Sequence, residues 1–214
     1  MVILTYFLQL IFLIGWTYYG NKLYQRTNKN FNISRLCNSA THAILVILCY
    51  LFYIPSYMLH YISITYYVID TLYEIINLFP QTEKNIKAYD FGTIAHHIII
   101  VLSLKYLLDP ITCSYVYYLF FLSELSNLPM YVVYYLKKTK YENDWVIRSI
   151  IILEAVGYIV LRLILGTKQV YELFFIPSIP MPMIISAISI LVISAIWTRK
   201  LVTQVFLLTP KSRN

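Results

Sequence analysis

Charge is scarce in this chain of 214 residues: only 13% of them are Asp, Glu, Lys or Arg, and 59% are hydrophobic. A soluble domain needs more polar surface than this, so the composition argues against a soluble globular protein and favours a membrane protein. Glycine is also rare, with five residues, and no Gly/Ser-rich linker or charged low-complexity tract divides the chain. We therefore expect one membrane-embedded unit with short loops.

Cysteine and histidine are too few for several kinds of site. The three cysteines have neither disulfide nor metal-ligand spacing. The four histidines are fewer than the di-iron sites of membrane desaturases need. The adjacent residues His96 and His97 would point about 100° apart on a helix, so they cannot chelate one ion by themselves. We predict no metal ion and no resident cofactor.

Long apolar runs dominate the remaining sequence. About 20 apolar residues cross the hydrocarbon core as a helix. On this criterion we expect seven transmembrane helices, at 2–19, 36–54, 61–79, 91–108, 112–136, 145–165 and 183–205. The first run has no basic region before it and no small-residue cleavage site, which favours a retained helix over a removed signal peptide.

The predicted fold class is an all-α, polytopic membrane helix bundle. Its expected organisation is a first helix with a basic cytosolic loop at 1–35, a six-helix domain at 36–206 and a cytosolic tail at 207–214. The sequence does not fix the oligomeric state.

Basic residues orient the predicted bundle, because they gather in alternate connections and in the tail, as cytosolic loops do. They are Lys22, Arg26, Lys29, Arg35, Lys84, Lys87, Lys137, Lys138, Lys140, Arg148, Arg199, Lys200, Lys211 and Arg213. The N-terminus is then outside or lumenal and the C-terminus cytosolic. The net charge of +7 follows this topogenic pattern, so nucleic acid is not an expected partner.

Polar side chains inside the predicted helices are the candidate functional residues. A charge at the bilayer centre costs about 2.5 to 3.5 kcal/mol even on a permissive insertion scale, so such groups must face one another or water. Helical spacing places each of the following sets on one face: Asp70 with Glu74, Glu124 with Asn127, Asn38 with His42, and Glu154 with Tyr158 and Arg162. We therefore expect the second to sixth helices to share a polar interior, in which Glu124 or Glu154 is the partner of Arg162.

The depth of these residues follows from the predicted topology. At 1.5 Å per residue, His96 and His97 lie roughly 8 to 9 Å inside the cytosolic end of their helix. His42 lies at a similar depth, Asp70 near the middle of the membrane, and Glu74 nearer the cytosol. The expected polar cavity is therefore open to the cytosol.

Five stretches of the sequence occur in the order found in one membrane family. They are SATHAILVILCYLFY, ITYYVIDTLYEI, TIAHHIII, FFLSELSNLP and VLRLILG. Residues 36–206 thereby resemble the TLC domain, which is named for a translocon-associated protein, the longevity-assurance ceramide synthase and a ceroid-lipofuscinosis protein. The resemblance implies a role in sphingolipid or phospholipid metabolism, with matching positions at His42, Asp70, His96, His97, Glu124 and Arg162.

The segment after the histidine pair departs from the ceramide-synthase pattern. Ceramide synthases follow their pair with further polar residues that include a His-Asp element, and this chain has IIIVLSLKYLLDPITCSYVYYLFFLSELSN there. The Ser-Glu-Leu-Ser stretch instead resembles the smaller family members, whose role is in membrane lipid composition.

Imidazole chemistry supports an enzymatic hypothesis. A neutral imidazole acts as a base or an acyl-accepting nucleophile near pH 7, and an adjacent carboxylate fixes its tautomer. In this hypothesis the chain is an acyltransferase of the ceramide-synthase type with acyl-CoA as a co-substrate. The catalytic residues are His96, His97 and Asp70, and the substrate-binding residues are His42, Glu74, Glu124, Asn127 and Arg162.

Two other hypotheses use the same residues without catalysis. The polar groups can form a hydrogen-bond network that holds helices together in a lipid-binding protein or a regulator of lipid composition. They can also line the path of a small-solute transporter. In the acyltransferase and lipid-binding hypotheses the partners are membrane lipids. The residues alone leave open whether the chain is an enzyme.

Overall fold

The computed structural model describes residues 2–27, 31–78, 88–177 and 179–208. Its regular elements are α1 (Val2–Arg26), α2 (Phe31–Leu51), α3 (Ser56–Leu78), α4 (Ala88–Leu104), η2 (Lys105–Leu108), α5 (Cys113–Lys138), α6 (Asp144–Gly157), η3 (Tyr158–Leu165), α7 (Gly166–Leu173) and α8 (Met181–Leu208). No strand occurs among these residues, which confirms the all-α prediction. Phe79, Lys29, Lys84, Lys87 and most of the predicted tail lie outside the described residues.

The helices keep the predicted order but differ in their ends. The first helix continues to Arg26, past the predicted end at residue 19, because polar residues extend it beyond its apolar run. The predicted sixth helix, 145–165, is too short: α6, η3 and α7 form one continuous rod of 30 residues, Asp144–Leu173. The chain remains helical through the polar stretch Gly166–Gln169, and α7 buries Val170 and Leu173 in the core.

Within the described residues, three helices are long and apolar enough, by length and composition, to cross a membrane: Ile33–Leu51, Asp144–Leu173 and Met181–Phe206. Thr93–Leu108 is apolar but shorter. Large apolar side chains stand exposed along the outer faces, including Ile152, Leu153, Ile164, Ile185 and Val192. Such a surface is costly in water and fits contact with lipid tails. The molecule is therefore a helix bundle of the membrane type.

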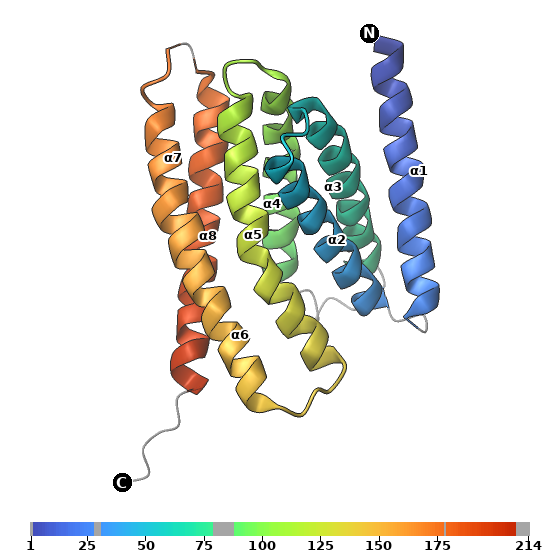
Figure 1. The fold of residues 1–214 in the computed structure, drawn as a ribbon, viewed down its shortest axis with the longest axis vertical. Helices are drawn as coiled ribbons and strands as arrows, with labels where there is room; N and C mark the ends of the chain where they lie inside the picture. Colours follow the sequence, from blue (N-terminus) through green and yellow to red (C-terminus); the bar gives the residue numbers. More distant parts are fainter. Residues whose placement is uncertain (1, 28–30, 79–87, 178, 209–214) are drawn as a thin grey trace.

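The helices run along the long axis of the molecule (Figure 1). Helix α1 lies at one edge beside α2 and α3, whereas α8 and the α6–α7 rod form the other edge (Figure 1). The C-terminal ends of α1 and α8, the start of α2 and the α5–α6 connection lie at one end of the bundle, which we call the basic end. The α2–α3, η2–α5 and α7–α8 connections lie at the opposite end (Figure 1).

Apolar packing and polar contacts occupy different parts of the interior. One buried apolar cluster includes Val46, Leu59, Leu104, Leu107 and Leu173, which come from five different elements. These residues lie mainly toward the opposite end, near the short connections. Of the polar residues singled out in the sequence, Asp70, His96, His97, Asn127 and Glu154 line a cavity nearer the basic end.

Candidate functional site

A partly buried ion cluster joins α2 to α3 near the basic end. Arg35 donates from Nε to Asp70 Oδ1 at 2.8 Å and from Nη2 to Asp70 Oδ2 at 3.1 Å, and it also pairs with Glu74. Such a two-point contact fixes both the guanidinium and the carboxylate. On the other side of Asp70, His97 Nε2 lies 3.7 Å from Oδ2. That separation exceeds a hydrogen bond, so the main partner of Asp70 is Arg35.

Arg35 was expected in a cytosolic loop, and that prediction is wrong. The residue lies in the second turn of α2, and its side chain reaches the interior carboxylates. Glu74, by contrast, is where its spacing places it, one turn from Asp70 on the same face of α3. Both carboxylates are therefore held by a cation that the sequence argument assigned elsewhere.

A second network centres on Glu124 of α5, whose residue is only 2% exposed. Tyr67 donates to Glu124 Oε1 at 2.8 Å, and Asn127 Nδ2 donates to Oε2 at 3.2 Å. His42 Nδ1 lies 3.5 Å from Oε1, while its Nε2 shares a hydrogen bond with Ser63 at 3.0 Å. His42 thus ties α2, α3 and α5 together, and both of its ring nitrogens face protein groups.

Arg162 lies in η3, a π-helical turn inside the long rod, and is 4% exposed. Its Nε donates to Ser126 Oγ at 2.6 Å, and its Nη2 donates to Ser123 O at 2.9 Å and to Asn127 Oδ1 at 2.8 Å. Nη1 donates to Ser194 of α8 at 3.4 Å. One guanidinium therefore links the rod to both α5 and α8. A π turn inside an α-helix often marks a functional position.

The expected partners of Arg162 were Glu124 and Glu154, and this prediction is wrong. Among the described residues, its side chain donates to hydroxyl, amide and backbone oxygens and lies over the Tyr158 ring, and neither carboxylate forms an ion pair with it. Asn127 stands between the charges, since its Oδ1 accepts from Arg162 while its Nδ2 donates to Glu124. The Asn127 amide therefore bridges Arg162 and Glu124, in place of the expected direct ion pair.

A polar cavity of about 370 Å³ lies in the half of the bundle near the basic end. Among the residues that line it are Arg35, Ser39, Asp70, Thr93, His96, His97, Asn127, Tyr131, Glu154, Tyr158, Trp197, Lys200 and Gln204. They come from α2, α3, α4, α5, the α6–η3 segment and α8. These contacts confirm that polar faces of the predicted second to sixth helices share one interior, and they add the last helix to it.

A smaller pocket of about 50 Å³ lies next to this cavity, toward the opposite end of the bundle. We call it the apolar pocket. Its wall is mostly apolar, with Ile100, Leu119, Phe120, Leu122, Leu161, Val170, Ala187, Ile190 and Leu191. Glu124, Arg162 and Ser194 supply its polar margin. A polar chamber followed by an apolar one suits an amphiphile that is bound head first.

His96 lines both spaces, together with Tyr67 and Asn127. Its Nδ1 is buried from solvent and has no hydrogen-bond partner in the structure. Its ring packs edge-on against Trp197 of α8, with 5.0 Å between centroids. Buried ring nitrogens normally find a partner, so His96 has hydrogen-bonding capacity left for a ligand.

The structure separates the predicted site residues into groups. His96, His97, Asp70, Asn127, Glu124 and Arg162 line one or both of the spaces. His42 is buried in the second network, and Glu74 is held by Arg35 outside the residues that line the cavity. Arg35, Tyr67 and Trp197 also line the cavity and were not among the predicted site residues. Arg35 lies three and seven residues before Asn38 and His42, so helical spacing alone was a sufficient signal.

Comparisons with protein-family models, with curated proteins and with solved structures found no match for this chain. Within the described ranges, no group of three or more His, Cys, Asp or Glu side chains is arranged to hold a metal ion. The class that the fold defines is therefore a helix bundle of the membrane type with a buried polar site, and its function must be argued from that site.

Proposed function

We propose that this chain is a seven-span protein of an endoplasmic-reticulum-type membrane that acts in lipid metabolism. It binds an acyl chain between its helices and transfers the acyl group to an acceptor. The TLC-like order of motifs in 36–206 agrees with this proposal. The observation that carries it is the unpartnered Nδ1 of His96 at the junction of the polar and apolar spaces.

In the proposed complex, the polar head of an acyl donor such as acyl-CoA occupies the cavity beside Lys200 and Gln204. The first methylene groups of its chain enter the apolar pocket between Leu119 and Leu191. The carbonyl carbon then lies against His96. The positive charge of Arg162, on the margin of the same pocket, stabilises negative charge that develops on the carbonyl oxygen.

The proposed reaction needs one proton carrier and no oxidant. A neutral His96 takes the proton from an acceptor hydroxyl or amine as the acceptor attacks the thioester carbonyl. When the carbon–sulfur bond breaks, the imidazolium returns that proton to the departing thiolate. The products are an ester or amide and a free thiol. His97, which lies against Asp70 and Thr71, is a positioning residue in this scheme.

Occupancy of the apolar pocket tests the binding step. Leu191→Trp fills the pocket, whereas Val192→Trp adds the same bulk one residue away, at a side chain that is 53% exposed toward the outside. We expect Leu191→Trp to lower the amount of acyl lipid that copurifies with the protein by about tenfold, equal to about 1.4 kcal/mol of binding free energy. Mass spectrometry of solvent extracts gives the ratio of lipid to protein.

The Val192→Trp control should copurify with as much lipid as the wild type. Equal lipid in all three proteins, each with an unchanged melting temperature, would remove the apolar pocket from the proposal and favour a transporter or a purely structural network.

The proposed orientation has its own test. In a background without the three native cysteines, Glu142→Cys places a thiol at the basic end and Tyr53→Cys places one at the opposite end, both at exposed positions. In sealed microsomes, a membrane-impermeant maleimide should label Glu142→Cys directly and Tyr53→Cys only after detergent is added. The reverse pattern would place the basic end in the lumen, contrary to the positive-inside rule.

The natural sequence Asn32-Ile33-Ser34 is an N-glycosylation motif and is expected to stay bare in the proposed orientation. It is a poor reporter, however, because Ser34 lies within α2, is buried, and donates its hydroxyl to Gly20 O at 3.2 Å. Because Ser34 is buried in this way, a bare Asn32 would not by itself report the orientation, and the thiol test is needed.

A further inference from the structure

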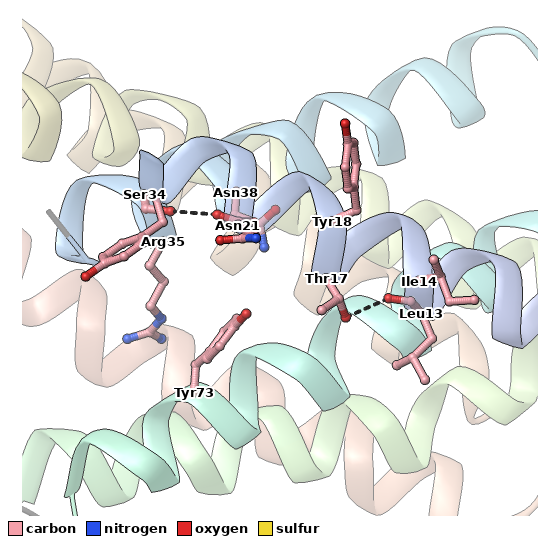
Figure 2. A pocket seen from close by; sticks show the side chains of 11 residues that line it. Leu13, Ile14, Thr17, Tyr18, Asn21, Ser34, Arg35, Asn38 and Tyr73 are labelled. Atoms are coloured by element: carbon pink, nitrogen blue, oxygen red, sulfur yellow. Dashed lines mark hydrogen bonds between the residues drawn. The ribbon is translucent and has the colours of Figure 1, made fainter. Parts of the chain in front are cut away.

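A separate cavity of about 620 Å³ lies between α1, α2 and α3, outside the candidate site (Figure 2). Its polar part is formed by Asn21, Asn38 and Tyr73, and Figure 2 shows the Tyr73 hydroxyl directed across the space toward the two asparagines. Leu13 and Ile14 line it further along α1 (Figure 2). We call this space the α1 groove.

Asn38 is the main sign that the α1 groove binds a ligand. The residue is 3% exposed, yet its Oδ1 has no hydrogen-bond partner in the structure. A buried amide oxygen left without a donor costs about 1–3 kcal/mol. Because Asn38 also lines the groove, a ligand that brings an O–H or N–H donor would remove this cost.

The charges around the groove argue against an anionic ligand. Arg35 lines it, but its guanidinium is held by Asp70 and Glu74, so this trio carries a formal charge of one negative unit. A phosphate in the groove would find its lining arginine already paired with two carboxylates that lie just outside the groove. An uncharged head with a hydroxyl or amide donor meets no such repulsion.

The part of the groove that lies away from Asn38, along α1, suits a lipid tail. Ile14 and Tyr18 of α1 are 59% and 62% exposed. Both side chains line the groove, so the groove is open at the surface of α1, which lies at the edge of the bundle (Figure 1). A lipid can therefore enter sideways, with its chains along α1 and its head beside Asn38.

We propose that the α1 groove is a second binding site, for a neutral membrane lipid whose head donates a hydrogen bond to Asn38. The inference does not depend on acyl transfer at His96. It assigns α1, which contributes no residue to the polar cavity or the apolar pocket, a role of its own.

Photolabelling tests the site with a diacylglycerol that carries a diazirine in one acyl chain, added to the full chain in nanodiscs. We expect labels on α1 peptides around Leu13 and Ile14. Unlabelled diacylglycerol should displace the probe at concentrations about tenfold lower than phosphatidic acid with the same chains, because only the former has an uncharged hydroxyl head.

Two variants test the polar and the apolar part of the groove separately. Asn38→Leu removes the acceptor, and Ile14→Trp fills the groove from an exposed position without disturbing buried packing. Each should lower the competed labelling about tenfold, equal to about 1.4 kcal/mol. Ile11→Trp, at a position that is 46% exposed on the same helix but outside the groove, should leave it unchanged, as should His96→Gln.

Labelling that neither lipid displaces, equal displacement by both lipids, or labelling that survives both groove variants would overturn the proposal. Photoproducts that join two copies of the chain through α1 would also overturn it, because the groove would then be an interface between copies.

Discussion

Replacing Arg35 with Met is expected to lower the free energy of unfolding by about 3–5 kcal/mol, because the change leaves buried negative charge without its cation. Asp70 is 2% exposed and receives both of its close hydrogen bonds from Arg35, which also pairs with Glu74. The methionine keeps most of the side-chain volume, so the loss is electrostatic rather than a cavity effect. The melting temperature of the detergent-solubilised protein measures it.

A double variant separates the contribution of the Arg35–Asp70 ion pair from other effects of the Arg35 substitution on stability. Asp70→Asn alone removes one carboxylate, and the combination Arg35→Met with Asp70→Asn should be more stable than Arg35→Met alone. Arg199→Met provides a matched control, since Arg199 is an exposed arginine near the basic end of α8. Equal losses for Arg35→Met and Arg199→Met would show that the buried pair does not stabilise the fold.

The sequence was sufficient to predict the helices because apolar runs and basic connections reflect the same physical requirement, the transfer of a chain into lipid. Helix ends were less predictable. The α6–α7 rod continues through Gly166 because Val170 and Leu173 pack into the core, and such tertiary contacts leave no local signal. The π turn that holds Arg162 was likewise not predictable from spacing, because the spacing of an ideal α-helix contains no such turn.

The sequence predicted which residues belong to the candidate site better than it predicted which of them contact one another. Helical spacing identified polar faces, and these faces do meet, but it could not say which groups pair. Asn127 bridges Arg162 and Glu124. Arg35 forms ion pairs with Asp70 and Glu74, which the sequence had placed beside the histidines. These choices depend on the rotation and height of each helix, which a single sequence does not contain.

The two histidines illustrate the same limit. Sequence alone could not choose between His96 and His97. In the structure His97 lies against Asp70 and Thr71, whereas His96 faces the junction of the two spaces with Nδ1 unpartnered. We therefore expect His96→Gln to lower acyl transfer by roughly 10²-fold or more, the usual contribution of a general base. Glutamine keeps hydrogen-bonding capacity but cannot take a proton near neutral pH.

His97→Gln is the matched control for this second prediction. It makes the same chemical change one residue away, at a side chain with protein neighbours on both ring nitrogens. It should keep more product than His96→Gln, since its role is positioning. Both variants should purify as folded proteins with melting temperatures close to that of the wild type, so that a loss of product cannot be attributed to unfolding.

The central claim is that His96 acts on an acyl group held between the polar cavity and the apolar pocket. The most direct measurement compares the entry of labelled fatty acid into ceramides and phospholipids in cells that express wild type, His96→Gln or His97→Gln at matched levels. We expect a lipid product that wild type makes, that His97→Gln still makes and that His96→Gln does not. The same products in the same amounts from all three proteins would contradict acyl transfer at His96 and leave a lipid-binding protein that does no chemistry.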